Sequence, residues 1–194
     1  MQTMHNKFFY VVLLLFFIGG KANAQSVAIK SDAFSTIAFF SPNIGMEYKL
    51  TDALSLNVTG NYNPLPRSGD FRRRHWLLNT GIRYWKCNVF SGHFVSAHVF
   101  AGEFNLAKIS LPFNILPDVK SYRHEGSILG AGVSYGYHWA LSPRWGIEVE
   151  AGIGAAYSSY EIFNCYRCGE KIDEKANYFL TPTKLAFSFV YILK

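Results

Sequence analysis

Two cysteines near the carboxyl end, in Cys165-Tyr166-Arg167-Cys168, are the first candidates for chemistry. Thiols at this spacing act in redox catalysis when they precede a helix of a thioredoxin-like fold, and no such context surrounds them. A structural zinc site takes four ligands, and Cys87 is the one further thiol in the chain. In an oxidising compartment, neighbouring thiols usually join. We therefore expect a loop-stapling disulfide between Cys165 and Cys168, with half a metal site or redox catalysis as the alternatives.

A run of arginines, Arg72, Arg73 and Arg74, precedes His75 and Trp76. Guanidinium groups bind phosphate oxygens bidentately, so this run is suited to contact the phosphates of an anionic outer-membrane lipid such as lipopolysaccharide. The alternative is a solvated basic rim above an aromatic residue at a membrane interface. The sequence leaves these two interpretations open.

Charged residues also lie on the polar faces of segments in which apolar and polar residues alternate: Glu47, Lys49, Arg83, Glu148, Glu150 and Lys184. Such alternation is typical of strands with one apolar face. An unpaired charge away from bulk water costs several kcal/mol, so acids and bases on the inner side of a barrel should pair. We expect an ionic network that fills the lumen, with a proton relay or a catalytic carboxylate pair as the alternative.

Polar groups on the same faces raise the question of catalysis. His98 and His138 could form a metal pair, although hydrogen-bonded interior histidines are more common. Ser134, His138 and Glu148 could form a lipase-like site, as could residues in many polar lumens. The chain contains no G-x-S-x-G, Walker or H-E-x-x-H motif. We therefore expect no catalytic residue, cofactor or metal, with an outer-membrane lipid-modifying enzyme as the alternative.

Long antiparallel strands are needed to position these residues. The clearest pair, from Ser127 to Leu141 and from Trp145 to Tyr157, flanks a turn at Ser142-Pro143-Arg144. The second strand spans roughly 40 Å between its two terminal aromatic residues. When it is tilted by about 40°, that length matches the band between two aromatic girdles of a membrane. The hairpin therefore indicates a membrane barrel.

Further strands are expected over residues 33–41, 44–50, 54–63, 76–85, 93–104 and 183–194. The total of eight is even, as in bacterial single-chain barrels. Short connections alternate with long ones over residues 64–75, 105–125 and 158–177, which predicts periplasmic termini and loops outside the cell. The expected fold class is all-β: an eight-stranded antiparallel up-and-down transmembrane β-barrel in the bacterial outer membrane.

The beginning of the chain predicts the compartment. A lysine at position 7, an unbroken apolar run over residues 8–18 and the sequence Ala22-Asn23-Ala24 together have the form of a secretory leader. We expect residues 1–24 to be a cleaved signal peptide and residues 25–194 to form one outer-membrane β-barrel domain. The net charge of +6 is mild and, together with the leader, argues against a nucleic-acid partner.

Several stretches resemble the family called domain of unknown function 3575: Gly60–Pro64, Arg83–Trp85, Gly92–Asn105, Gly130–Trp145, Cys165–Gly169 and Asn177–Lys184. They follow one another over nearly all of the chain after the leader. The resemblance implies a Bacteroidetes outer-membrane barrel of OmpA/OmpX-like size, sometimes encoded near fimbrial genes. It implies no agreed activity and no catalytic residues.

The function predicted from these features is non-enzymatic: an outer-membrane barrel that displays surface loops, with a structural, adhesion or fimbria-associated assembly role. Its expected partners are outer-membrane lipid or lipopolysaccharide and fimbrial or other cell-envelope proteins, and the fimbrial part rests on the resemblance alone. A small pore is an alternative that a filled lumen disfavours. A soluble lipocalin-like barrel is the structural alternative, because its strands also alternate.

Overall fold

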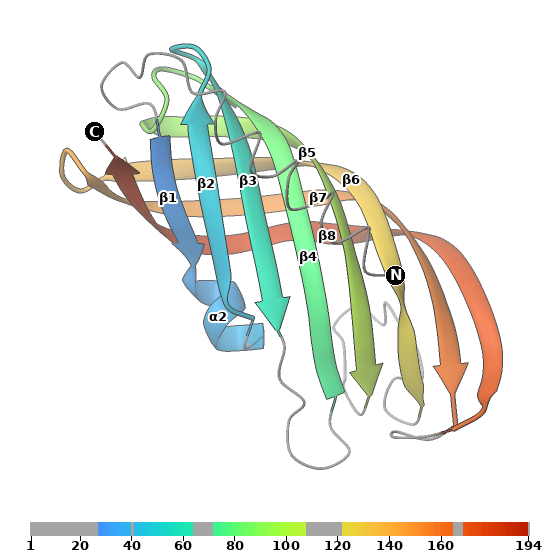
Figure 1. The fold of residues 1–194 in the computed structure, drawn as a ribbon. Coiled ribbons are helices and arrows are strands. Elements are labelled where there is room, and N and C mark those ends of the chain that lie inside the picture. Colours follow the sequence, from blue (N-terminus) through green and yellow to red (C-terminus); the bar gives the residue numbers. More distant parts are fainter. Residues whose placement is uncertain (1–26, 40, 64–71, 108–121, 165–168, 194) are drawn as a thin grey trace, which may run out of the picture.

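The computed structural model describes residues 27–39, 41–63, 72–107, 122–164 and 169–193, with only the backbone described at 38, 39, 72 and 73. Their elements are β1 (Val27–Asp32), α2 (Ala33–Phe39), β2 (Asn43–Lys49), β3 (Leu54–Asn63), β4 (Arg72–Trp85), β5 (Gly92–Ala107), β6 (Arg123–Ala140), β7 (Trp145–Phe163) and β8 (Lys171–Leu193). Figure 1 shows their arrangement. No helix in the described part of the chain has the length and apolar character to cross a membrane.

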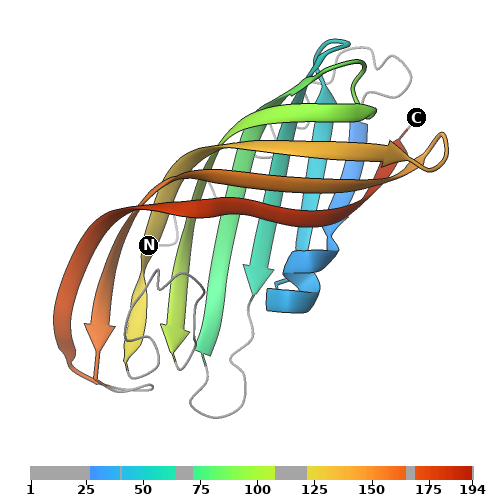
Figure 2. The same cartoon turned by 180° about the vertical axis from the view of Figure 1, so that it is seen from behind.

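The eight strands form one antiparallel sheet in which each strand pairs with the next along the chain. β1 pairs with both β2 and β8, so the sheet closes on itself. Figures 1 and 2 show short strands at β1–β3 and much longer strands at β5–β8. The all-β, up-and-down antiparallel fold with eight strands is therefore confirmed.

The sheet has two different ends. The turns after β2, β4 and β6 lie at one end, together with Val27 of β1 and its partner Leu193 of β8. We call this the short-turn end. The other end, where β3 stops and β4 begins, carries α2 and is called the long-loop end (Figure 1).

The prediction of a first strand over residues 33–41 is wrong. β1 lies earlier, and residues Ala33–Phe39 form α2. The Asp32 carboxylate accepts hydrogen bonds from the amides of Phe34 (2.9 Å) and Ser35 (3.1 Å), which caps the start of the helix. This segment is apolar but alternates poorly, so its composition did not distinguish a strand from a helix.

The strands also extend further toward the long-loop end than the alternation predicts. The expected loops over 64–75, 105–125 and 158–177 contain strand residues 72–75, 105–107, 123–125, 158–163 and 171–177. Residues 171–178 of β8 are all exposed, so polar side chains occupy both faces and the alternation is lost. The backbone pairing nevertheless continues, for example between Phe163 and Lys171. We call residues 72–75, 104–107, 123–127, 159–163 and 171–176 the sheet extension.

Side chains on the two faces of the sheet differ sharply. Outward positions carry exposed apolar residues, among them Leu129, Val133 and Ile153, at 60%, 61% and 59% exposure. Inward positions carry buried polar and charged residues as well as aromatic rings. Glycine on the inner side of β6 gives these rings room: a Cβ at Gly136 would come 2.3 Å from the ring of Phe94. The interior is therefore packed with side chains.

Candidate functional site: a buried ionic cluster inside the barrel

Arg83 of β4 lies at the centre of the interior and contacts three carboxylates. Its Nη1 is 2.9 Å from Glu47 Oε2 and 2.8 Å from Glu148 Oε2. Its Nη2 is 2.9 Å from Glu148 Oε1 and also donates to Glu150 Oε2. All four side chains are at most 2% exposed. Strands β2, β4 and β7 place them there because the inward faces of a small barrel meet at its axis.

Two lysines complete the charge balance. Lys30 Nζ is 2.9 Å from Glu47 Oε2 and 3.5 Å from Glu148 Oε1, and Lys184 Nζ is 3.1 Å from Glu150 Oε1. Three carboxylates therefore face three cations, and the cluster carries no net charge. We call Lys30, Glu47, Arg83, Glu148, Glu150 and Lys184 the ionic cluster.

Serine hydroxyls satisfy the remaining carboxylate oxygens of the cluster. Ser55 donates to Glu47 Oε1 and Ser134 donates to Glu150 Oε1, each at 2.5 Å. A buried charged pair is tolerated when its remaining lone pairs are also hydrogen-bonded. The cluster meets that condition at all three carboxylates.

Lys49 does not belong to the ionic cluster, which corrects its predicted place in the lumen network. It lies at the end of β2 and pairs with Asp52 of the following turn, Nζ to Oδ1, at 2.7 Å. The Lys49 contact holds the pKa of Asp52 below its ordinary value. Lys30 takes the vacant role in the cluster, and it was missed because β1 was expected six residues later in the chain. The other predicted members, Glu47, Arg83, Glu148, Glu150 and Lys184, lie together.

Aromatic residues block the interior between the ionic cluster and the short-turn end. The Trp85 indole donates to Ser55 Oγ (2.8 Å) and packs against Phe94 at 4.8 Å between ring centroids. Phe90 contacts Trp85 edge-on at 6.1 Å, and the Arg83 guanidinium lies 4.2 Å from the Phe94 ring centroid. We call Trp85, Phe90 and Phe94 the aromatic plug. Their side chains are buried and belong to one apolar cluster with Ala28, Val89, Val190 and Ile192.

The interior histidines have separate surroundings. His98 Nε2 is 2.9 Å from the Thr183 hydroxyl, whereas His138 Nδ1 lies 3.8 Å from Glu148 Oε2. Ser134 is hydrogen-bonded to Glu150 and not to the carboxylate beside His138. The serine and histidine of the lipase-like set thus face different carboxylates. Among the described residues, no group of three or more histidines, cysteines, aspartates or glutamates could hold a metal ion.

The arginine run belongs to strand β4 in place of the expected loop. Arg72, Arg73 and Arg74 pair with residues 107, 106 and 105 of β5, and the Arg74 side chain is exposed. The side chains of Arg72 and Arg73 lie outside the described residues. The same holds for the expected signal peptide and for the expected disulfide between Cys165 and Cys168. Cys87 is described, as an exposed free thiol near the short-turn end.

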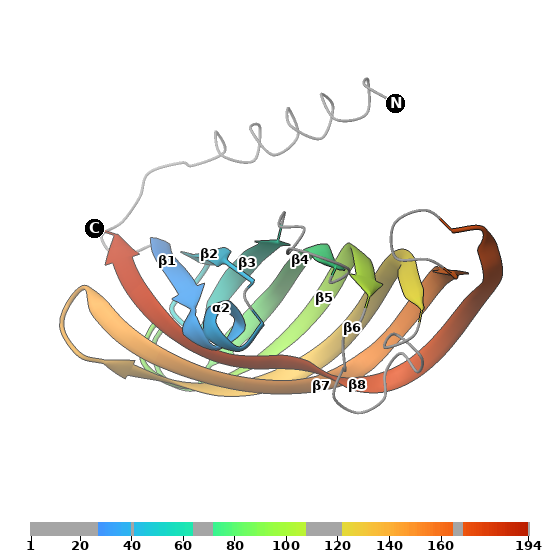
Figure 3. The same ribbon diagram turned by 90° about the horizontal axis from the view of Figure 1, so that it is seen from below.

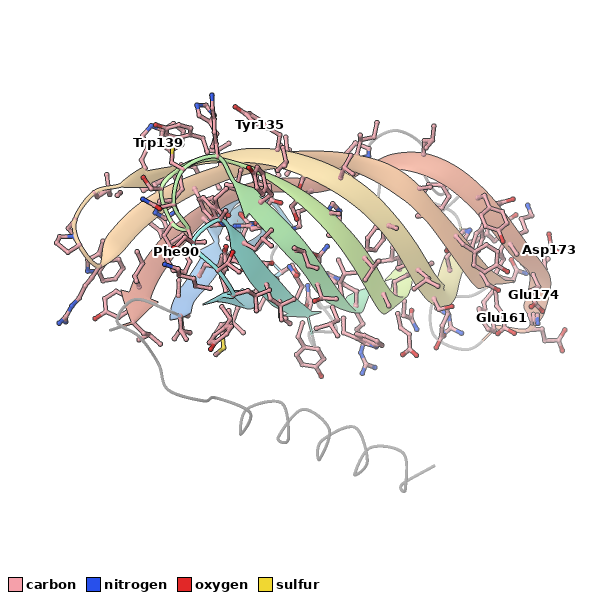
Figure 4. All side chains as sticks on the ribbon, turned by 90° about the horizontal axis from the view of Figure 1, so that it is seen from above. Phe90, Tyr135, Trp139, Glu161, Asp173 and Glu174 are labelled. Carbon is pink, nitrogen blue, oxygen red and sulfur yellow. The ribbon has the colours of Figure 1, made fainter. Side chains whose placement is uncertain are left out.

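Charged side chains gather again at the tip of the sheet extension. Figure 4 shows Glu161, Asp173 and Glu174 together at one end of the sheet, far from Tyr135 and Trp139. Lys171 donates to both glutamates of this group at 2.7 Å. Lys171, Asp173 and Glu174 are exposed and Glu161 is half-buried, in contrast to the fully buried ionic cluster, so the extension has a polar surface on the side away from the short turns.

An up-and-down antiparallel sheet of eight strands, closed around a neutral ionic cluster, defines a small β-barrel protein. Residues 9–193 match the model of a family described as "Protein of unknown function (DUF3575)", and the chain belongs to this family. The resemblance found from the sequence motifs is thereby confirmed. No curated protein matches the chain.

Proposed function

We propose that this protein is a non-enzymatic outer-membrane barrel that displays its sheet extension and long loops at the cell surface. One observation carries the proposal: on the central part of the sheet, apolar side chains cover the outside and the charged side chains lie inside. An apolar surface of this extent is rare on a soluble monomer and typical of a surface that contacts other apolar matter. A soluble lipocalin-like barrel would need the reverse arrangement, with the apolar face lining a ligand cavity.

A belt of outward apolar side chains runs over strands β2 to β8. Its exposed apolar members are Ile44, Met46, Leu56, Val58, Leu78, Ile82, Val95, Val99, Leu129, Val133, Val149, Ile153, Leu180, Leu185, Phe187 and Phe189. Lipid excludes charges from such a band, and lysine or arginine at its middle costs about 2–4 kcal/mol. The charges that the central strands do carry, such as Arg83 and Glu148, are buried inside.

Aromatic pairs border the belt on both sides. The tilted rings of Trp145 and Tyr191 lie 4.8 Å apart between centroids toward the short-turn end, and those of Tyr157 and Tyr178 lie 4.7 Å apart toward the long-loop end. Tyrosine and tryptophan favour the membrane–water interface because their rings are apolar and their polar atoms reach water. The two pairs support an apolar band bounded by two interfaces, with the sheet extension beyond the second one.

The filled interior supports a barrel that displays surface loops and argues against a pore that conducts ions. The ionic cluster and the aromatic plug occupy the lumen one above the other, as expected for a barrel of this strand number. We place the short turns and both termini in the periplasm, following the expected leader at residues 1–24. Arg72, Arg73 and Arg74 then lie near the outer interface, where contact with lipopolysaccharide phosphates is part of the proposal. A fimbrial or other envelope partner follows from the family analogy alone.

Site-directed labelling tests this topology. The full chain with Cys87, Cys165 and Cys168 changed to serine receives one new cysteine, at Lys175 in the extension, Leu129 in the belt or Arg144 in a short turn. A membrane-impermeant maleimide is then added to intact cells. We expect Lys175→Cys to react in intact cells and Arg144→Cys only after the outer membrane is permeabilised.

The belt position decides between the membrane and soluble forms. Leu129→Cys should stay unlabelled in intact and permeabilised cells and react once the protein is denatured, because lipid covers it. Labelling of Leu129→Cys in native protein, at the rate seen for Lys175→Cys, would exclude the membrane topology.

A further inference from the structure

A cavity of about 130 Å³, lined by both polar and apolar side chains, lies inside the barrel on the long-loop side of the ionic cluster. Amides and hydroxyls line it from several elements, including Asn43 of β2, Asn79 of β4 and Ser35 of α2. Lys30 and Lys184 on its wall are paired with carboxylates of the cluster, and the Asp32 carboxylate, also on the wall, accepts hydrogen bonds from backbone amides. The cavity thus offers hydrogen bonds without a net charge.

Asn79 places a buried hydrogen-bond acceptor without a partner at the cavity. The side chain is 5% exposed and its Oδ1 accepts no hydrogen bond in the described structure. A buried acceptor without a partner costs about 1–3 kcal/mol. On the opposite wall, Lys184 Nζ lies 3.1 Å from Glu150 Oε1, and its ammonium group has three N–H donors. A group that both donates and accepts, such as a hydroxyl, would satisfy both residues.

A seam in the barrel wall lies beside the cavity. β1 pairs with β8 only along Ser188–Leu193, whereas β7 pairs with β8 from Lys171 to Tyr191. Residues 171–187 of β8 therefore have no described strand on their second side. Pro182 lies in this stretch, where the lack of an amide hydrogen is tolerated at a sheet edge. The sequence predicts this strand only from residue 183, and β8 begins at Lys171 instead.

The cavity borders the sheet edge at this seam. Lys184 faces inward and Leu185 faces outward with 58% exposure, yet both line the cavity. Both residues lie in the part of β8 that no described strand covers on its second side, so the cavity borders this edge of the sheet. Figure 3 shows α2 within the curve of the sheet beside β8, and Ser35 of α2 also lines the cavity. α2 thus lies against β8 along the seam.

We propose that this cavity binds a small uncharged hydroxyl-bearing group, and that the seam admits it as the head of a membrane amphiphile. The proposal rests on the membrane topology proposed above, since the exposed Leu180 and Leu185 would then hold the apolar tail in the bilayer. A free polyol entering from the long-loop end shares the same head chemistry. Binding of a tailed or an untailed probe distinguishes these two sources.

The test uses the full mature chain folded in detergent micelles, with native mass spectrometry as the readout. The probes are monoolein, which has a glycerol head, oleate, which has a charged head, and free glycerol. We expect one monoolein adduct per barrel and none with oleate. Asn79→Leu, which fills the cavity and removes the acceptor, should weaken monoolein binding roughly tenfold. Asn105→Leu is the matched control outside the cavity and should bind as the unchanged chain does.

The outcomes distinguish whether the cavity binds a hydroxyl-bearing group from the route by which that group enters. Monoolein binding without glycerol binding supports entry through the seam, and equal binding of both supports the site with entry from the long-loop end. The absence of any adduct, or equal binding by Asn79→Leu, would overturn the proposal and leave a cavity that holds water only. Gel mobility before and after boiling is measured on each sample, so that loss of the folded membrane barrel is recognised separately. If Asn79→Leu does not fold, Asn79→Ala removes the acceptor with a smaller side chain.

Discussion

Arg83 and Glu148, 65 positions apart in the chain, are joined by two hydrogen bonds of 2.8 and 2.9 Å inside the barrel. This bidentate contact links β4 to β7 across the interior, and Glu47 and Glu150 bind the same guanidinium. The strands concerned are not neighbours in the sheet. The contact therefore braces opposite walls of the barrel in addition to the backbone pairing between adjacent strands.

Removal of Arg83 should destabilise the barrel strongly. Arg83→Ala leaves three buried carboxylates with two lysines, and breaking a buried ion pair from one side costs about 3–5 kcal/mol. The free energy of unfolding in urea, measured with the protein in lipid vesicles, is the readout. Lys49→Ala is the control, because Lys49 pairs outside the cluster and its loss should change the free energy by less than about 1 kcal/mol. Equal effects of the two substitutions would refute the bracing role.

Lys30 should behave as a member of the cluster although its strand lies far from Glu148 in sequence. Lys30→Met removes the ammonium that contacts Glu47 and Glu148 and retains the length of the side chain. We expect a loss of about 2 kcal/mol or more in unfolding free energy, and about half of it to return when Glu47→Gln is combined with it. Additive effects of the two changes would show that the residues are not coupled.

Asp32 should stabilise the contact between α2 and β8 at the point where the β1–β8 pairing ends. Its carboxylate caps α2 and its Oδ1 also accepts a hydrogen bond from the Phe187 amide at 2.9 Å, where the β1–β8 pairing ends. Asp32→Ala should cost about 1–2 kcal/mol. Hydrogen exchange should speed up at the amides of Phe34, Ser35 and Phe187, while the amides of Val27 and Ile29 keep their protection. Uniform acceleration over all of β1 would indicate global destabilisation instead.

Asp52 supplies a pH-dependent contact at the short-turn end. The Lys49 hydrogen bond lowers the pKa of this carboxyl below 3.8, so its contribution is present above that pH and is lost as the pH falls through the lowered value. The titration of Asp52 by carboxyl NMR should have a midpoint below 3.8 in the unchanged protein. Lys49→Ala should return the midpoint to its ordinary value, and an unchanged midpoint in this variant would exclude Lys49 as the cause.

The interior should not conduct ions. The Trp85 indole, Phe94 and the ionic cluster fill successive levels of the lumen. In planar bilayers the purified barrel should give no conductance steps above the lipid background. Insertion is confirmed by recovering from the same membranes protein whose gel mobility changes on boiling. Steady ohmic steps that scale with protein concentration would favour the small-pore alternative.

The parts of the fold that the sequence predicted are those where one side of a strand meets an apolar surface. Along β6 and β7, alternation from Leu129 to Trp139 and from Trp145 to Tyr157 marks the strands correctly. Alternation ends where the sheet extension leaves the belt, because exposed polar residues such as Asp173 and Lys175 suit both faces. The long ends of β7 and β8 therefore gave no periodic signal.

The charged residues of the interior were predicted correctly wherever the strand that carries them was predicted correctly. Inward positions in recognised strands, such as Arg83, Glu148 and Glu150, do lie together. Lys30 was not predicted because the first strand was placed in the apolar run that follows it. That run forms a helix, which Asp32 caps. Lys49 was misplaced because a long side chain at a strand end reaches the turn, a choice that alternation alone does not decide.

The electrophoretic mobility of the membrane fraction, with and without boiling, tests the membrane barrel most directly. Cells expressing the full chain are fractionated, and the protein is followed in the soluble and outer-membrane fractions. We predict that it is found in the outer membrane and migrates differently before and after heating, because a closed sheet braced by Arg83 and Glu148 resists detergent until heated. A soluble periplasmic protein whose mobility does not change on heating would contradict the proposed membrane topology.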